Sequence, residues 1–253
     1  MKLVFFDLET GGFDPERHPI IQIAAMAVDA NLNPIQTFEV KIKFDLATAD
    51  PEALQKNSYH AETWEREAVS EIFACHEFSA FLKRHSDVKL VSQRTGRPYL
   101  VAQLIGQNAD TFDNPFLQAW YKRLDQFLPA APRVMCTYQR AMHFFLEKPY
   151  LEPPTSYRLE DLAKYFQFDL KNAHDALADV MATHHIYKAM RLHEAALRST
   201  IGTMLPWALI GLNDSNSAVQ FARELGFTSP CALSEEEQRQ ITALLSSKLG
   251  FHG

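Results

Sequence analysis

A chain of 253 residues with 47% apolar residues is long enough for one large domain, or for an ordinary domain with a small appendage. Its formal net charge of −6 at pH 7 argues against a protein that coats duplex nucleic acid through its own charge. Three cysteines cannot form a disulfide framework, and no apolar run is long enough to span a bilayer. We therefore expect a cytoplasmic protein without a membrane partner, in which any phosphate-bearing substrate is held locally.

The first predicted element is a short buried strand at Leu3–Phe6, followed by two acids. Asp7 and Glu9 stand two positions apart, so their side chains point to the same face of the strand. Gly11-Gly12 then ends the strand. Two carboxylates on one face of a buried strand end are unfavourable unless a cation lies between them. The pair therefore predicts half of a metal site, and an acidic strand end without a metal is the alternative.

The predicted elements that follow alternate between strands and helices. Residues 20–28 form a second, largely buried strand, and the alternation of Phe38, Val40 and Ile42 with polar residues predicts a third. The later elements are a loop or short helix over 50–63, a helix over 69–84, a hairpin of 88–91 and 99–105, a helix over 116–127, a strand over 134–137, and helices over 138–146, 159–166 and 173–197.

This order predicts an α/β domain with a mixed sheet over residues 1–196, because a meander precedes alternating strands and helices. Residues 197–253 show helical patterning only, with apolar stripes and neither an acid pair at metal spacing nor a basic run. We expect a small helical extension there, docked on the first domain, on a second copy in a homodimer or on a protein partner.

Two later stretches carry further acids. Asp113 stands at a predicted strand-to-helix junction, where α/β sheets place ligand-binding groups, and the Asn108 amide is suited to order the turn before it. Asn172 is a good N-cap for the last long helix. His174 and Asp179 are five residues apart, about 140° around a regular helix. With His174 in the first turn, both side chains can approach one site over the sheet edge.

These residues lead to a family. The stretches DLET at 7–10, NxxxFDxPFL at 108–117 and HxAxxD at 174–179 resemble, in this order, the motifs of the DEDDh 3′→5′ exonucleases. The family includes DnaQ-like proofreading domains and ribonuclease T-like enzymes, and the resemblance covers roughly residues 2–196. A tyrosine four residues before the last acid would mark the sister subclass, but Asp175 stands there. The resemblance implies a ribonuclease H-like fold with a mixed five-stranded sheet flanked by helices.

The resemblance also implies the chemistry. Asp7, Glu9, Asp113 and Asp179 would hold two divalent ions, Mg²⁺ or Mn²⁺, since hard cations prefer oxygen ligands. Phosphodiester hydrolysis needs a nucleophile at neutral pH and stabilisation of the developing charge, which two such ions supply. His174 would be the general base, with a pKa suited to neutral pH. Substrate-binding positions implied by the motifs are Thr10, Tyr59, His60, Asn108 and Phe112.

Two features outside the motifs are further candidates for substrate binding. Phe13 follows the glycine pair and either stacks on a base or packs in the core. Arg94 and Arg97 lie at the tip of the predicted hairpin, where they either guide the strand through its phosphates or form a solvated turn. The hairpin is longer than the minimal pattern of the family.

The sequence thus predicts a metal-dependent 3′→5′ exonuclease that binds single-stranded nucleic acid or 3′ ends and releases nucleoside 5′-monophosphates, with DNA favoured over RNA. The alternatives are an exoribonuclease of the same family, a non-hydrolysing module that binds nucleic-acid ends, and an adaptor that tethers a partner through the C-terminal helices. The residues do not separate DNA from RNA, because the metal chemistry is indifferent to the 2′-hydroxyl.

Overall fold

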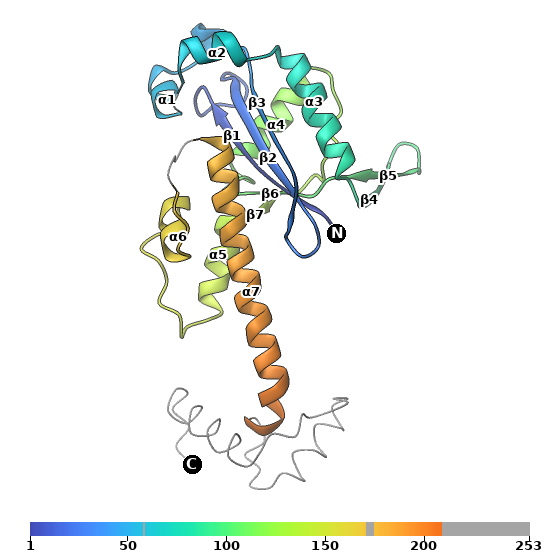
Figure 1. Cartoon of the computed structure of the whole chain (residues 1–253). Helices are drawn as coiled ribbons and strands as arrows, with labels where there is room; N and C mark the ends of the chain where they lie inside the picture. The colour runs from blue at the N-terminus through green and yellow to red at the C-terminus, as the bar shows by residue number, and fades with distance from the viewer. Residues whose placement is uncertain (58, 171–174, 209–253) are drawn as a thin grey trace. The chain divides into compact units, whose positions relative to one another are not determined.

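The computed structural model describes residues 1–57, 59–170 and 175–208, with side-chain surroundings up to residue 195. The chain divides into two compact units, Met1–Met190 and Arg191–Gly253. In chain order the elements are β1 (Leu3–Thr10), β2 (Ile20–Val28), β3 (Pro34–Lys41), η1 (Leu46–Thr48), α1 (Pro51–Lys56), α2 (Ala61–Glu67), α3 (Glu71–Arg84), β4 (Val88–Val91), β5 (Pro98–Val101), β6 (Leu104–Gly106), α4 (Asp113–Arg123), β7 (Met135–Cys136), α5 (Thr137–Leu146), α6 (Leu159–Tyr165) and α7 (Ala176–Ala208) (Figure 1).

The main sheet has five strands in the order β3-β2-β1-β6-β7. Strands β1, β2 and β3 are antiparallel, whereas β6 and β7 run parallel to β1. Val4 of β1 lies between Ala27 of β2 and Leu104 of β6, so β1 is a central strand. The predicted α/β class with a mixed five-stranded sheet is confirmed.

The two faces of β1 bury different partners. Phe6 points into the largest core cluster, which it shares with Phe78 of α3 and Trp120 of α4. Phe5 points to the opposite face and packs in a second cluster with Val180 of α7. Asp7 and Glu9 follow Phe5 by two and four residues. Because side chains alternate along a strand, both acids lie on the face of β1 that α7 covers.

Helix α7 also packs against α5 and α6. Phe145 of α5, Leu162 of α6 and Ile186 of α7 are buried in a third cluster. The His184 imidazole lies 2.9 Å from the backbone oxygen of Leu32 through Nε2. Helix α7 is therefore fixed along the sheet by both apolar and polar contacts.

The predicted long strand over 99–105 is wrong. Strand β5 ends at Val101 and pairs only with β4, as a separate two-stranded ribbon, while β6 begins at Leu104 in the main sheet. Between them the Ala102 N–H donates to the Pro129 oxygen at 3.0 Å, so the backbone leaves the ribbon at this point. The ribbon projects to the right of the sheet in Figure 1, near the N-terminus of the chain.

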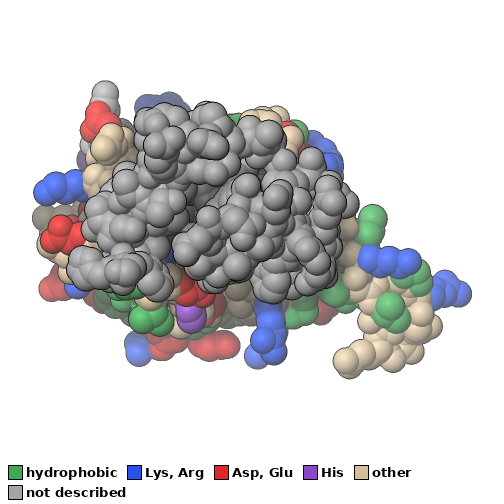
Figure 2. All heavy atoms as spheres, turned by 90° about the horizontal axis from the view of Figure 1, so that it is seen from below, with side chains coloured by type: hydrophobic (Ala, Val, Ile, Leu, Met, Phe, Trp, Pro, Cys, Tyr) green, Lys and Arg blue, Asp and Glu red, His purple; other side chains and the backbone are tan. Residues whose placement is uncertain are grey.

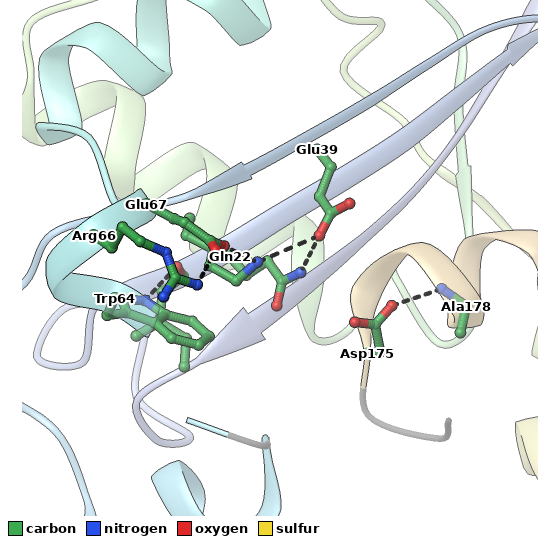
Figure 3. A network of polar contacts seen from close by, with 9 residues as sticks. Gln22, Glu39, Trp64, Arg66, Glu67, Asp175 and Ala178 are labelled. Atoms are coloured by element: carbon green, nitrogen blue, oxygen red, sulfur yellow. Dashed lines mark hydrogen bonds and ion pairs between the residues drawn. The ribbon is translucent and has the colours of Figure 1, made fainter. Parts of the chain in front are cut away.

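Helix α2 is fastened to the antiparallel edge of the sheet by polar contacts (Figure 3). The Trp64 indole donates to the Ile21 oxygen at 3.3 Å. The Lys41 ammonium on β3 lies 3.2 Å from the Glu67 carboxylate of α2 and 3.7 Å from Glu39. These contacts hold α2 beside Ile21, at the start of β2.

The start of α7 differs from the prediction. The helix begins at Ala176, and the Asp175 carboxylate caps it by accepting from the Ala178 N–H at 3.1 Å (Figure 3). The residue predicted as the cap, Asn172, lies outside the described residues. No helix in the described part of the chain combines the length and the apolar character needed to cross a membrane.

Candidate active site

Three carboxylates converge at the end of the central strand. Asp7 and Glu9 project from the α7 face of β1, and Asp179 comes from the first turn of α7. One oxygen of each lies within 4.8 Å of the others. Hard oxygen donors at this separation can share one divalent cation, which is the geometry that the sequence predicted for these three acids.

The fourth acid, Asp113, is the first residue of α4. It is buried, and its Oδ1 accepts from the Leu8 N–H at 3.1 Å, which ties the start of α4 to β1 between the two strand acids. The turn before it is ordered by Asn108, whose side-chain oxygen accepts from the Thr111 hydroxyl at 2.8 Å. Asn108 has a positive φ of 55°, a conformation that asparagine tolerates better than most residues.

The acids raise one another's pKa values. Burial raises the pKa of Asp7 well above its usual range, and the charges of Asp113, Glu9 and Asp179 add to it. Burial, then Asp179, raises the pKa of Glu9 to about 8. Burial raises the pKa of Asp113 to about 7, against the hydrogen bond from Leu8 that lowers it. The buried carboxylates repel one another when they are ionised, and a bound cation would offset that repulsion.

A cleft of about 180 Å³ opens over the four acids. Of the predicted substrate-binding residues, four line it: Thr10, Phe13, Asn108 and Phe112. The Phe13 ring is 77% exposed and meets the Phe112 ring edge-to-face at 6.3 Å between centroids. Phe13 therefore has no core role, and the two rings form an aromatic wall beside the carboxylates.

Two other predicted residues, Tyr59 and His60, do not line this cleft, and a third lies outside the described residues. Tyr59 packs between Phe44 and Trp64, with ring centroids 5.4 and 5.1 Å away. His60 is exposed at the start of α2. Neither belongs to the described residues that line the cleft, and their substrate contacts stay predictions. His174 lies outside the described residues.

Arg94 and Arg97 are exposed in the turn of the β4–β5 ribbon. The Lys2 N–H donates to the Asp87 carboxylate at 2.7 Å, so the base of the ribbon lies beside the residue that precedes β1. From Lys2 to Asp7 the chain rises roughly 17 Å at the usual 3.3–3.4 Å per residue. The ribbon therefore starts at the opposite end of β1 from the acids.

Sequence reasoning missed three polar residues that line the cleft: Lys56, Asn57 and Gln107. The Asn57 amide donates to the Thr10 oxygen at 2.8 Å, and the Gln107 amide donates to the Tyr157 oxygen at 2.8 Å. None of the three lies within the motifs at 7–10, 108–117 and 174–179, so these motifs gave no signal for them.

A ribonuclease H-like sheet with four acids gathered at the end of its central strand defines a class of protein, the nucleases that cleave phosphodiester bonds. The family model of the RNase T exonucleases matches residues 4–92 and 99–187. The chain belongs to this family, and is a 3′→5′ exonuclease of the DEDDh type.

Curated relatives agree with this assignment. The chain is 29% identical to a ribonuclease T from Actinobacillus pleuropneumoniae over 196 residues, which are 74% of this chain and 82% of the relative. It is 29% identical to an oligoribonuclease from Corynebacterium glutamicum over 128 residues, 50% of this chain and 56% of that relative.

Solved structures show the same fold. Escherichia coli exonuclease I in complex with a dT13 oligonucleotide superposes with a TM-score of 0.61 at 20% identity, over 80% of this chain. Exonuclease I from Methylocaldum szegediense gives a TM-score of 0.60 at 21% identity, over 79% of this chain. The chain spans less than half the length of either structure, 43% and 42%.

Proposed function

We propose that this exonuclease uses two divalent cations, Mg²⁺ or Mn²⁺, to remove nucleoside 5′-monophosphates from the 3′ ends of single-stranded nucleic acid. The observation that carries the proposal is the convergence of Asp7, Glu9 and Asp179 within 4.8 Å, with Asp113 in the same cleft. The donor set fits hard cations, because it consists of carboxylate oxygens that are mostly buried and repel one another.

Each acid has a role in this proposal. Asp7, Glu9, Asp113 and Asp179 hold the cations, and the backbone bond from Leu8 orients Asp113 toward the others. When bound, the cations supply electrostatic stabilisation of the charge that develops on the phosphoryl group and on the departing 3′ oxygen. His174 acts as the general base that takes a proton from the attacking water, a role suited to a pKa near neutrality.

The aromatic wall supports binding of the terminal base. Phe13 and Phe112 line the cleft next to Thr10, whose hydroxyl donates to the Gly12 oxygen at 2.7 Å and so shapes the turn after β1. Stacking of a base on an aromatic ring contributes ~1–3 kcal/mol and tolerates any base. We therefore assign this wall to sequence-independent binding of the last nucleotide.

We propose DNA as the favoured substrate, in keeping with the fold shared with exonuclease I, whose solved structure holds a DNA oligonucleotide. The competing candidate is an exoribonuclease, favoured by the names of the relatives ribonuclease T and oligoribonuclease. The four acids give no support to a module that binds nucleic-acid ends without hydrolysis. Such a module does not need a cluster of buried carboxylates that repel one another.

End-labelled single-stranded DNA and RNA of matched sequence, incubated with Mg²⁺ or with EDTA, test the proposal. We expect stepwise shortening from the 3′ end with Mg²⁺ only, faster on DNA. Asp7→Asn should reduce turnover by orders of magnitude without unfolding the protein, whereas Glu16→Gln, which changes an exposed acid outside the cleft, should not. Cleavage in EDTA, or an active Asp7→Asn variant with Mg²⁺ as the sole metal, would contradict the metal site.

A further inference from the structure

One wall of the active cleft is formed by the short helix α1 and the residue that follows it. Ala53, Lys56 and Asn57 line the cleft from this side, while the acids come from β1, α4 and α7. The wall therefore belongs to a segment that carries none of the four carboxylates.

Both ends of α1 are fastened to the end of β1. At its start the Asp50 N–H donates to the Gly11 oxygen at 2.6 Å. At its end the Asn57 amide donates to the Thr10 oxygen at 2.8 Å. Between them the half-buried Leu54 packs with the cluster around Trp64. A helix tied at both ends to the strand that carries two acids holds its side chains at a fixed place in the cleft.

Lys56 is the one Lys or Arg among the described residues that line the cleft. Its positive charge acts on Glu9 and lowers the pKa of that carboxyl, against the larger effects of burial and of the neighbouring acids. Among the described residues the Lys56 ammonium makes neither a hydrogen bond nor an ion pair. An exposed cation with free donors thus faces the space above the acids.

We propose that Lys56 binds the phosphate of the 3′-terminal nucleotide, first as part of the strand and then as the 5′-phosphate of the released monophosphate. The inference rests on the proposed function. An ammonium group is a standard phosphate partner that acts as a point charge. A monoester carries about −1.5 to −2 charges at pH 7 and a diester only one, so the contact strengthens once the bond is cleaved. Lys56 then contributes to substrate binding and slows product release.

The test is calorimetric binding of a nucleoside 5′-monophosphate and of the matching nucleoside to the full chain, with Ca²⁺ in place of Mg²⁺. Lys56→Met should weaken monophosphate binding roughly tenfold or more, as expected for a lost charge-assisted hydrogen bond, and leave nucleoside binding unchanged. Lys56→Arg should keep most of the affinity. Gln55→Met, an exposed neighbour on the same helix outside the cleft, is the matched control and should behave as the parent.

Equal monophosphate affinity in Lys56→Met and the parent would overturn the inference. So would an equal loss of nucleoside affinity, or a loss that Lys56→Arg does not restore, since either indicates a change of shape and not a lost phosphate contact. A parent that cleaves oligonucleotides but binds no monophosphate would overturn the inference and leave the proposed function standing. A parent that cleaves nothing would instead contradict the proposed function.

Discussion

At the scale of single residues, protonation of the acid cluster couples the stability of the protein to pH. Glu9 and Asp113 have pKa values of about 8 and about 7 in the fold, above their ordinary values of 4.5 and 3.8. Groups with raised pKa values stabilise the fold while protonated, so this contribution is complete at low pH and is lost as the pH rises through the folded values. The metal-free site therefore opposes folding at pH 8.

We expect the melting temperature in EDTA to fall between about pH 5 and pH 8, by roughly 2–4 °C for each kcal/mol lost in a chain of this size. Mg²⁺ should raise it more at pH 8 than at pH 5, because only the ionised acids bind the cation. Differential scanning fluorimetry measures both effects. The double variant Asp7→Asn, Glu9→Gln should give a flatter curve, and a double variant as steep as the parent would assign the pH dependence to other groups.

The proposed general base gives a second residue-scale prediction. His174→Ala should reduce kcat by about 10²–10⁴ with a smaller effect on KM, since proton transfer occurs in the transition state. The acid limb of the pH–rate profile should flatten, because that limb reports protonation of the base. His143→Ala, on the exposed face of α5, is the control and should keep the parent profile. An unchanged acid limb in His174→Ala would place the base elsewhere.

At the scale of elements, the β4–β5 ribbon is the part of the first unit most clearly set apart from the catalytic cleft. The family model leaves out residues 93–98, which form most of its turn. Residues 88–101 contain three cations, Lys89, Arg94 and Arg97, and no acid, in a chain with a net charge of −6. Figure 2 shows Lys and Arg side chains on the projection at the right, with no acidic side chain visible on it.

We therefore expect the ribbon to act on long strands only. Arg94→Ala with Arg97→Ala should raise KM for long oligonucleotides, leave a trinucleotide unaffected, and reduce the salt slope of binding by up to about two. Lys83→Ala with Arg84→Ala, two exposed cations at the end of α3, is the charge-matched control. If both double variants have the parent's salt slope, the ribbon is a solvated turn.

At the scale of the whole molecule, the catalytic unit and the C-terminal residues are separable in principle. The family model ends at residue 187, and the buried side chains that α7 gives to the third core cluster, Ala182, Ile186 and Met190, all precede Arg191. Our proposal that residues 1–196 form the exonuclease domain and 197–253 a helical extension implies that the extension carries no catalytic group.

Truncation after Ala196 should therefore keep Mg²⁺-dependent cleavage of short oligonucleotides within a few-fold of the full chain, with a change in solubility or oligomeric state. Single-turnover assays and size-exclusion chromatography measure the two effects, and circular dichroism checks folding. A folded truncation that has lost all cleavage of a dinucleotide would show that the extension completes the active site.

Much of this architecture follows from local pattern. The apolar run of 20–28 has the same bounds as β2, and the even spacing of Asp7 and Glu9 places both on one face because strands have a period of two. The run from Tyr99 to Ile105 is apolar except for Gln103, so its pattern alone does not show that its two halves join different sheets. Which sheet each half joins depends on its pairing partner, which is β4 for β5 and β1 for β6.

The cleft was less predictable than the acids that line it. Lys56 ends a six-residue helix that has no buried residue, so no periodicity distinguishes it from a solvated lysine. Its place depends on two hydrogen bonds, from Asp50 to Gly11 and from Asn57 to Thr10, which join positions 39 and 47 residues apart. Likewise the packing of Tyr59 on Trp64 depends on how α2 lies over β2.

The distance between the ribbon and the cleft also sets the shortest nucleic-acid strand that can contact both, and the products of digestion would show that length. A strand that reaches from the acids to the base of the ribbon already spans roughly 17 Å, or about five stacked nucleotides at 3.4 Å each. Arg94 and Arg97 lie in the turn beyond that base, so a contact with them needs a longer strand. Once trimming has shortened a strand below the reach of the turn, only the cleft still holds it. Time courses on a long strand would then show a pause, with a transient band longer than about five nucleotides, and the pause would disappear in the Arg94→Ala, Arg97→Ala variant.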